Sequence, residues 1–261
     1  MTRERTLTEE LLAEAVAAPS ITLPPPAPPE PEPAAPTVLG TPAVRLVVNR
    51  IAYAVKRRSP LCVVAGEHGG GKTTAATLYA NSNPRALYWQ APPEYNAREI
   101  VADLCEKLGI RTGEAWRVRT SVLVTHLKEH PHTILIDEAQ RLDYRALDMI
   151  KYVADSAGVT FVLLGSPWLD RVIDRHTDIA SRAWVRVRVK PIELDAFTAL
   201  YEPMGYSKKV LKAAHEATKG VMRSIVALFD HLDEGVASVP GMTRADLTPE
   251  HVRAVADEVL S

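Results

Sequence analysis

A glycine-rich loop that ends in a lysine and a hydroxyl carries the strongest chemical signal in this chain. Residues 66–73 match the phosphate-binding spacing G-x-x-x-x-G-K-[ST]. In such a loop, backbone N–H groups and a helix N-terminus face an anion, the lysine reaches the β- and γ-phosphates, and the hydroxyl holds Mg²⁺. We therefore expect ATP and Mg²⁺ to bind here. The residues expected around the nucleotide are Gly66, Glu67, His68, Gly69, Gly70, Gly71, Lys72, Thr73 and Thr74.

Two adjacent carboxylates at the end of an apolar run supply the second signal. Asp137 and Glu138 follow Thr133-Ile-Leu-Ile. Beside a phosphate-binding loop, an aspartate at a strand's C-terminal end helps to hold Mg²⁺, and the next residue, Glu138, can orient the attacking water as general base. We expect these acidic groups one sheet position from the strand that enters the loop. The sequence offers no phosphate-acceptor site, which favours hydrolysis over phosphate transfer.

Three further polar residues stand where they can sense the γ-phosphate. Ser166 follows the apolar run 161–165, and its hydroxyl can bind the water or the phosphate; a plain loop residue is the alternative. Arg182 precedes another apolar run and can project toward the phosphate of a neighbouring subunit. Arg223 lies in the first turn of an expected helix, where a cation is easier to explain beside an anionic phosphate. A solvated basic face competes for the nearby Arg171, Arg175, Arg186 and Arg188.

Apolar runs alternate with helical patterns between residues 41 and 190. The expected strands are 61–65, 86–90, 133–137, 160–164 and 184–189, and the expected helices are 42–58, 73–81, 95–108, 120–129 and 143–156. This alternation predicts an α/β domain with a five-stranded parallel sheet covered on both faces. The last strand alternates valine with arginine, which is typical of an edge with one solvated face. Residues 191–261 are all helical in pattern and predict a lid, with its longest loop at 235–245.

The remaining sequence sets limits on location and partners. Residues 1–18 are expected to form a short tethered helix that docks on a partner, with a disordered tail as the equal alternative. Residues 19–40 are expected to form a linker, because nine of the chain's 20 prolines fall in 19–36. Cys62 and Cys105 are expected to be reduced core thiols. No apolar run approaches the length of a membrane span, and no apolar signal core is present, so we expect a cytoplasmic protein without membrane contact.

The order of these motifs resembles the AAA+ ATPases. The shared set is the P-loop, the Asp-Glu strand end, the polar Ser166, the Ser-Arg pair before the fifth strand, and Gly-x-x-Arg in the lid. Within that class, "LIDEAQ", "LLGSP" and "IASR" resemble the TnsC, TniB and MuB transposition regulators over about residues 40–255; secretion ATPases of the ExeA type share several of these matches. The resemblance implies ATP-driven homo-oligomers, as rings or helical filaments on double-stranded DNA, that recruit a transposase and disassemble on hydrolysis.

A DNA surface is expected between the second and third strands. In assemblies of the resembled branch this region lines the central pore, and its cations are Arg98, Lys107, Arg111, Arg117 and Arg119. Contacts from such groups to the DNA backbone are salt-sensitive and largely independent of sequence. A solvated loop is an equal alternative, because the formal net charge of the chain is only -1.

We therefore expect an ATP-dependent, sequence-independent DNA-binding regulator of transposition. An AAA+ ATPase that acts on a protein partner in secretion or signalling is one alternative, and a replication or repair loader is another.

Overall fold

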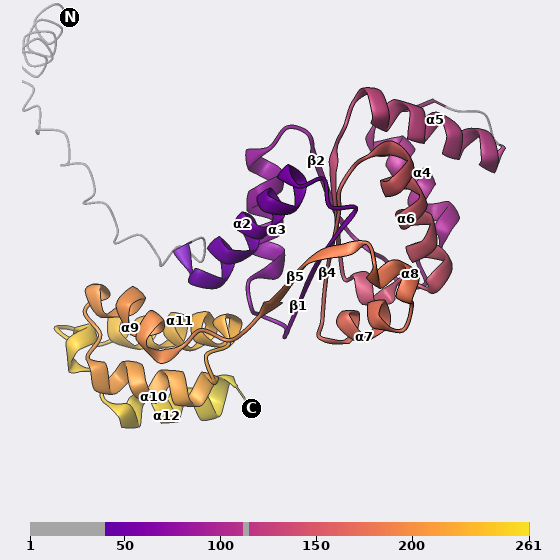
Figure 1. Cartoon of the computed structure of the whole chain (residues 1–261). Coiled ribbons are helices and arrows are strands. Elements are labelled where there is room, and N and C mark those ends of the chain that lie inside the picture. Colours follow the sequence, from indigo (N-terminus) through magenta and orange to yellow (C-terminus); the bar gives the residue numbers. More distant parts are fainter. Residues whose placement is uncertain (1–39, 112–114, 261) are drawn as a thin grey trace, which may run out of the picture. The chain divides into compact units, whose positions relative to one another are not determined.

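The computed structural model describes residues 40–111 and 115–260, which belong to one structural unit (Figure 1). The predicted helix at 1–18 and the predicted linker, except for Gly40, lie outside the described residues.

A parallel five-stranded sheet forms the centre of the α/β region. Its strands are β1 (Leu61–Gly66), β2 (Ala86–Gln90), β3 (Thr133–Asp137), β4 (Phe161–Gly165) and β5 (Ala183–Val189). They are arranged in the order β2-β3-β4-β1-β5, and every pairing is parallel. The predicted parallel sheet is confirmed, and β5 is an edge strand in which buried and exposed residues alternate.

The position of β4 corrects one expectation. We expected β3, which ends in Asp137, to lie next to β1 in the sheet. Instead, β4 pairs with both β1 and β3 and separates them. Strand order depends on how the connecting helices pack over the sheet, and a local pattern of residues contains no such information. A contact between the residues that follow β1 and β3 must therefore cross the end of β4.

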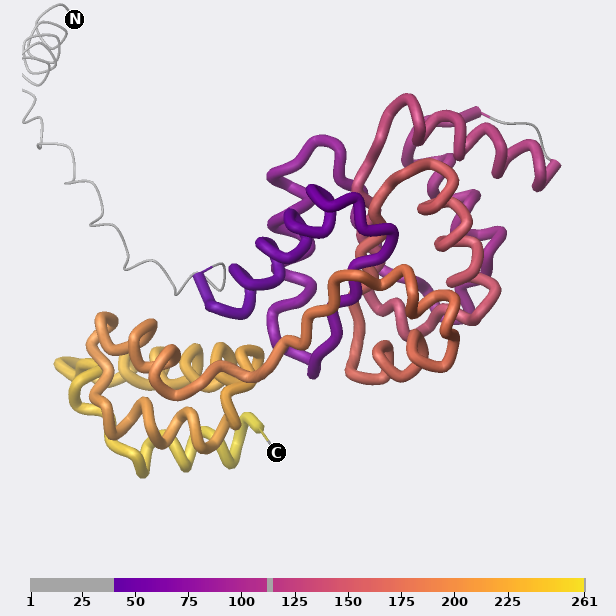
Figure 2. The backbone as a smooth tube through the Cα atoms, in the orientation of Figure 1, coloured from indigo at the N-terminus to yellow at the C-terminus, as the bar shows by residue number. Residues whose placement is uncertain are grey.

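Helices cover both faces of the sheet (Figures 1 and 2). Leu61 and Val63 of β1 pack into one apolar cluster, and Cys62 and Val64 pack into the other, because successive strand residues face opposite sides. The second cluster includes α2 (Pro42–Lys56) and α3 (Lys72–Ser82). The first cluster includes α4 (Ala97–Lys107), α5 (Trp116–Glu129), α6 (Tyr144–Ala157), α7 (Trp168–Asp174) and α8 (Thr177–Ala180).

Side-chain caps fix the start of several helices. Thr41 accepts a hydrogen bond from Val44 N at 3.3 Å ahead of α2, and Asp143 accepts one from Ala146 N at 2.7 Å ahead of α6. Asn96 forms a reciprocal capping box with Glu99 at the start of α4. Loss of such a cap destabilises a helix by about 1 kcal/mol.

Helix boundaries differ from the sequence pattern in two places. Helix α5 begins at Trp116, four residues before the expected start. Residues 168–180 form α7 and α8, where the sequence indicated only a basic stretch. Helix α7 is anchored by two buried apolar residues, Leu169 and Ile173, and α8 by one, Ile179, which are too few to give a clear helical period.

The C-terminal helices have their own apolar core. They are α9 (Leu194–Tyr201), α10 (Lys208–Thr218), α11 (Met222–Ser238) and α12 (Pro249–Val259), with 3₁₀ turns η3 (Glu202–Met204) and η4 (Arg244–Asp246). Ser207 and Thr248 cap α10 and α12 through their side chains. The expected loop at 235–245 was partly wrong: α11 continues through Gly235, because its buried stripe extends to Leu232 and Val236.

Both cysteines are buried and free, as predicted. Burial raises the pKa of the Cys62 thiol to about 12 and also raises that of Cys105. Among the described residues, no helix combines the length and apolar character required to cross a bilayer.

Candidate nucleotide site

The loop between β1 and α3 forms the floor of the candidate site. Gly71 is the N-cap residue of α3, so the backbone N–H groups of the helix start are free of side-chain caps. Gly69 has a φ of 76°, and a Cβ there would lie 2.7 Å from the Cβ of Arg223. Only glycine suits this position, because it combines a left-handed backbone with a close approach to α11. The geometry leaves an anion-binding helix N-terminus open.

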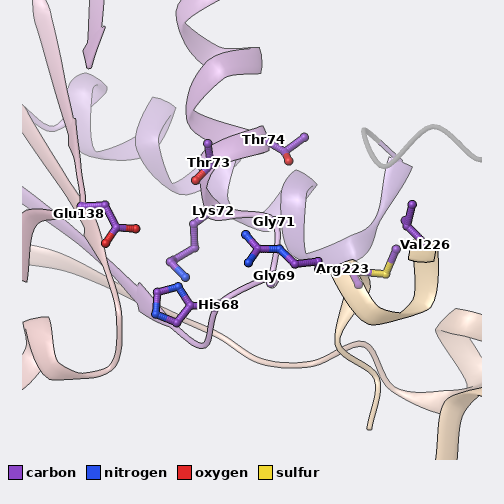
Figure 3. Close-up of a pocket in the computed structure, with 11 residues that line it drawn as sticks. His68, Gly69, Gly71, Lys72, Thr73, Thr74, Glu138, Arg223 and Val226 are labelled. Carbon is purple, nitrogen blue, oxygen red and sulfur yellow. The ribbon is translucent and has the colours of Figure 1, made fainter. Parts of the chain in front are cut away.

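A cavity of about 270 Å³ lies over this loop (Figure 3). The P-loop and α3 meet Glu138, which follows β3, and the first turns of α11 around it. Two cations and one carboxylate thus border the same space. The lining residues are His68, Gly69, Gly70, Gly71, Lys72, Thr73, Thr74, Glu138, Met222, Arg223 and Val226.

The Lys72 ammonium is held by the loop itself. Its Nζ donates to Gly66 O at 2.7 Å and to Glu67 O at 2.8 Å, and the residue is only 7 % exposed. Burial lowers the Lys72 pKa, while the nearby carboxylates of Asp137, Glu138 and Glu67 oppose that shift. A lysine so placed presents a desolvated positive charge to the cavity, where an anion interacts with it more strongly than in bulk water.

Thr73 and Asp137 form an oxygen pair suited to Mg²⁺. Thr73 Oγ1 donates to Asp137 Oδ2 at 2.6 Å, and Asp137 is 2 % exposed. Within the described ranges, no group of three or more His, Cys, Asp or Glu side chains is placed to hold a metal. A hydroxyl and one carboxylate nevertheless fit Mg²⁺, which retains several waters and takes other ligands from phosphate.

Tyr88 on β2 was missed in the sequence analysis. Its hydroxyl donates to Asp137 Oδ2 at 3.2 Å, and the Tyr88 pKa is raised to about 12 by burial and by the Asp137 charge. Tyr88 therefore remains a protonated donor at neutral pH. The register that pairs β2 with β3 brings it to Asp137, and no local motif indicates this.

Glu138 begins a 3₁₀ turn, η2 (Ala139–Arg141), in a left-handed conformation with a φ of 55°. Its backbone N–H donates to Asp137 Oδ1 at 2.8 Å. Gln140 Nε2 donates to Glu138 Oε2 at 2.7 Å, and Ser166 N donates to Gln140 Oε1 at 3.1 Å. The structure thus connects Ser166 to Glu138 through Gln140, a residue that the sequence analysis quoted within a motif without giving it a role.

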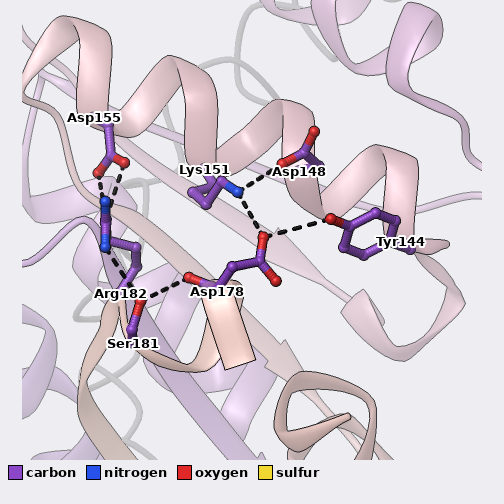
Figure 4. Close-up of polar contacts among 7 residues, drawn as sticks. All are labelled: Tyr144, Asp148, Lys151, Asp155, Asp178, Ser181 and Arg182. Carbon is purple, nitrogen blue, oxygen red and sulfur yellow. Dashed lines mark hydrogen bonds and ion pairs between the residues drawn. The ribbon is translucent and has the colours of Figure 1, made fainter. Parts of the chain in front are cut away.

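Arg223 and Arg182 occupy different environments. Arg223 borders the cavity from the first turn of α11. Arg182 lies outside that lining, where its Nε donates to both Asp155 carboxylate oxygens at 3.0 and 2.9 Å and its NH1 to Ser181 Oγ at 3.2 Å (Figure 4). Because Arg182 was predicted to act on a neighbouring subunit, its role stays a prediction.

The five predicted DNA contacts are spread over α4, α5 and the segment between them, which contains Arg111. Arg98 and Lys107 lie nine residues apart on α4, about 14 Å along the axis. Three carboxylates, those of Glu99, Asp103 and Glu106, lie between them in sequence. Lys107 stacks over the Trp89 ring at 5.5 Å, and Arg119 is half-buried. Arg111 and Arg117 are exposed, and the DNA role of this group stays a prediction.

Sequence comparisons agree with this geometry. A family model described as an AAA domain matches residues 55–173. The Mu-like prophage FluMu DNA transposition protein B of Haemophilus influenzae is 28% identical over 161 residues, which cover 59% of this chain and 55% of that protein. The match thus spans about half the length of that relative.

Solved structures share the fold at low sequence identity. Cdc6p from Pyrobaculum aerophilum has a TM-score of 0.65 and 17% identity over 87% of this chain and 70% of its own. The Aeropyrum pernix ORC1 protein, solved in complex with DNA, has a TM-score of 0.56 and 17% identity. The match covers 85% of this chain and 68% of that protein. The AAA domain match over residues 55–173, the parallel sheet and the similarity to transposition protein B together support the resemblance to AAA+ ATPases of the MuB and TnsC branch.

Proposed function

We propose that this protein is an ATP- and Mg²⁺-dependent ATPase that assembles on double-stranded DNA and regulates transposition by recruiting a transposase. The observation that supports the nucleotide part is the shared cavity of Lys72, Thr73 and Glu138 beside the Thr73–Asp137 hydrogen bond. The transposition part rests on the similarity to a relative named as a DNA transposition protein.

In the proposed reaction, the loop binds and orients the triphosphate. Lys72 contacts the β- and γ-phosphates, the start of α3 donates backbone N–H groups, and Thr73 and Asp137 would hold the metal. When bound, Mg²⁺ neutralises phosphate charge and polarises the oxygen that is bonded to phosphorus. Arg223 adds a second positive charge from the lid side of the cavity.

Glu138 is the proposed general base. It accepts a proton from water as the water oxygen bonds to the γ-phosphorus and the bond to the ADP oxygen breaks, so ADP and phosphate leave. Ser166 is proposed to sense the γ-phosphate at the end of β4. Arg182 of a neighbouring subunit is proposed to stabilise the developing charge, which would make hydrolysis depend on assembly.

Self-assembly supports DNA binding by a nearly neutral chain. A single patch of two or three cations binds DNA weakly, but repeated copies in a ring or filament act at high effective concentration. The cations proposed for this contact are Arg98, Lys107, Arg111, Arg117 and Arg119.

The first test compares ATP hydrolysis with and without duplex DNA, at low and at moderate salt. We expect the protein to co-sediment with duplex DNA in the presence of ATP, and its turnover to change when DNA is added at low salt. Added salt should weaken both effects, because backbone contacts release counterions. Hydrolysis that is indifferent to DNA, without co-sedimentation, would contradict the DNA role and favour a protein partner.

Lys72→Ala should lose ATP binding. Removing a charged hydrogen-bond donor costs about 1.5–3 kcal/mol, roughly a 10- to 100-fold loss of affinity. Titration of a fluorescent ATP analogue measures the change, and Lys212→Ala, at an exposed lysine of α10, is the matched control. Affinity that survives in Lys72→Ala would refute the phosphate site.

Glu138→Gln should bind ATP yet hydrolyse it slowly, because a general base contributes about 10²- to 10⁴-fold to the rate. Steady-state phosphate release and nucleotide affinity are measured together, with Glu216→Gln, an exposed α10 residue, as control. We also expect oligomers to accumulate on size exclusion with ATP. Normal turnover by Glu138→Gln would exclude this residue as the base.

A further inference from the structure

We propose that Gln140 is a positioning residue that ties the Glu138 carboxylate to the end of β4. This inference rests on the proposed function, in which Glu138 is the base. The Gln140 amide is used at both ends: its Nε2 donates to Glu138 Oε2 at 2.7 Å, and its Oε1 accepts from Ser166 N at 3.1 Å. A side-chain amide can make both bonds at once, because it has a donor and an acceptor on one planar group.

The carboxylate has few other supports. Glu138 has a left-handed backbone, and its one ion pair among the described residues is with Arg141, whose NH2 lies 3.7 Å from Oε2. The Arg141 side chain is 37 % exposed, and its NH1 donates to Ala91 O at 2.8 Å, so it constrains the carboxylate loosely. Gln140 fixes Oε2, and no described residue bonds Oε1, the oxygen left to accept a proton from water.

Gly165 provides a second, independent observation. A Cβ at Gly165 would lie 2.3 Å from Gln140 Oε1, too close for any real contact. The φ of Gly165 is not in the left-handed region, so alanine suits its backbone. Its Cβ would conflict most with Gln140 Oε1 and would also lie 3.2 Å from two side-chain atoms of Leu169. The last residue of β4 is therefore shaped around the Gln140 amide. A shift of Ser166 would pass directly to the base through this amide.

The test uses two routes to disturb the same amide. Gln140→Leu should lower kcat by about 10- to 100-fold, with the Kd for ATP and Tm near wild type, because an error of about 1 Å in orientation costs up to 10² in rate. As a single variant, Gly165→Ala should lower kcat, but in a Gln140→Ala background it should add little further loss, because only the milder contact with Leu169 remains. Gly235→Ala, whose Cβ meets nothing within 4 Å, is the matched control.

Each outcome assigns success or failure to one claim. If wild type hydrolyses ATP, Glu138→Gln is impaired and Gln140→Leu keeps its kcat, the positioning role is overturned. Equal losses from Gly165→Ala in both backgrounds also overturn it. If wild-type protein shows no nucleotide binding or turnover, the proposed function fails, irrespective of Gln140.

A second inference rests on charge at the opposite edge of the sheet. A cavity of about 470 Å³ lies where β1, β2, β3 and β4 begin, and its basic lining residues are Arg58, Arg85, Lys128 and His132. We call these four residues the basic edge. Strands of five residues separate it from the nucleotide edge by about 16 Å.

The charges of the basic edge lack compensation. Arg58, Arg85 and Lys128 are exposed, and their side chains make no ion pair or hydrogen bond with another described residue. Helices α2, α3, α5 and α6 end nearby, and their last carbonyls favour cations by about 0.3–1 kcal/mol each. The helix carbonyls explain why cations are found at this edge. They do not account for the side-chain N–H donors of Arg58, Arg85 and Lys128, which have no partner among the described residues.

Helix α2 extends the positive surface away from this cavity. Residues 41–66 contain no Asp or Glu and five cations, of which four are exposed beyond the basic edge: Arg45, Arg50, Lys56 and Arg57. A 15-residue helix is about 22 Å long. Such an extent suits a row of phosphates better than one small anion, since duplex DNA carries a charge every 1.7 Å or so.

From this surface we infer that the basic edge and α2 contact the phosphate backbone of duplex DNA. The inference rests on the DNA part of the proposed function and adds a second contact surface to the one proposed at α4 and α5. No carboxylate is among the residues that line the cavity at the basic edge, whereas three acidic residues lie between Arg98 and Lys107 on α4.

Fluorescence anisotropy with labelled duplex DNA and ATP tests this assignment at two salt concentrations. The double variant Arg58→Glu/Arg85→Glu should lower affinity at least tenfold and reduce the salt slope by about two, while ATP affinity stays unchanged. Arg117→Glu/Arg119→Glu is the matched comparison on α5. Loss of binding in the α5 variant alone overturns the inference, as does DNA binding that inorganic phosphate displaces at matched ionic strength. Wild type that binds no DNA contradicts the proposed function itself.

Discussion

The nucleotide edge depends on one hydrogen bond that crosses a strand. Thr73 follows β1 and Asp137 ends β3, and neighbouring strands lie about 4.8 Å apart, so with β4 between them the two strands are separated by roughly 10 Å. Thr73 Oγ1 nonetheless reaches Asp137 Oδ2 at 2.6 Å. The start of α3 must therefore lean over the end of β4, and β4 ends at Gly165, which has no side chain to obstruct the groups above it.

Glu138, which follows Asp137, is held in an unfavourable backbone conformation by its hydrogen bonds with Asp137 and Gln140. A non-glycine residue in the left-handed region costs roughly 1–2 kcal/mol, and Glu138 adopts it. Its N–H bond to the Asp137 carboxylate and its own bond from Gln140 are charged hydrogen bonds, which contribute about 1.5–3 kcal/mol each. Asp137, Glu138 and Gln140, the proposed metal ligand, base and positioning residue, are thus joined by hydrogen bonds, so a change in one of them would disturb its bonded neighbours.

Sequence reasoning succeeded where the signal is local. The strand before residue 66, the helix after Lys72 and the carboxylates after β3 follow from runs of apolar residues and from a phosphate-binding spacing. It failed where partners are distant in sequence: β4 between β1 and β3, Tyr88 beside Asp137, and Ser166 joined to Gln140 all depend on register across the sheet. The longer α11 followed from a buried stripe that outweighs the helix-weakening effect of Gly235.

The ion pair of Arg182 bears on how assembly can control hydrolysis. The side chains of Arg182 and Asp155 are 42% and 34% exposed, and pairs of this kind contribute about 0–1 kcal/mol. Asp155 therefore keeps the arginine ordered without holding it firmly. A γ-phosphate from a neighbouring subunit would offer bonds of greater strength in a less solvated place. In the proposed assembly, Arg182 leaves Asp155 for the γ-phosphate only when the neighbouring subunit brings that phosphate within reach. The rate of ATP hydrolysis is therefore set by the geometry between subunits and not by the strength of the Arg182–Asp155 ion pair.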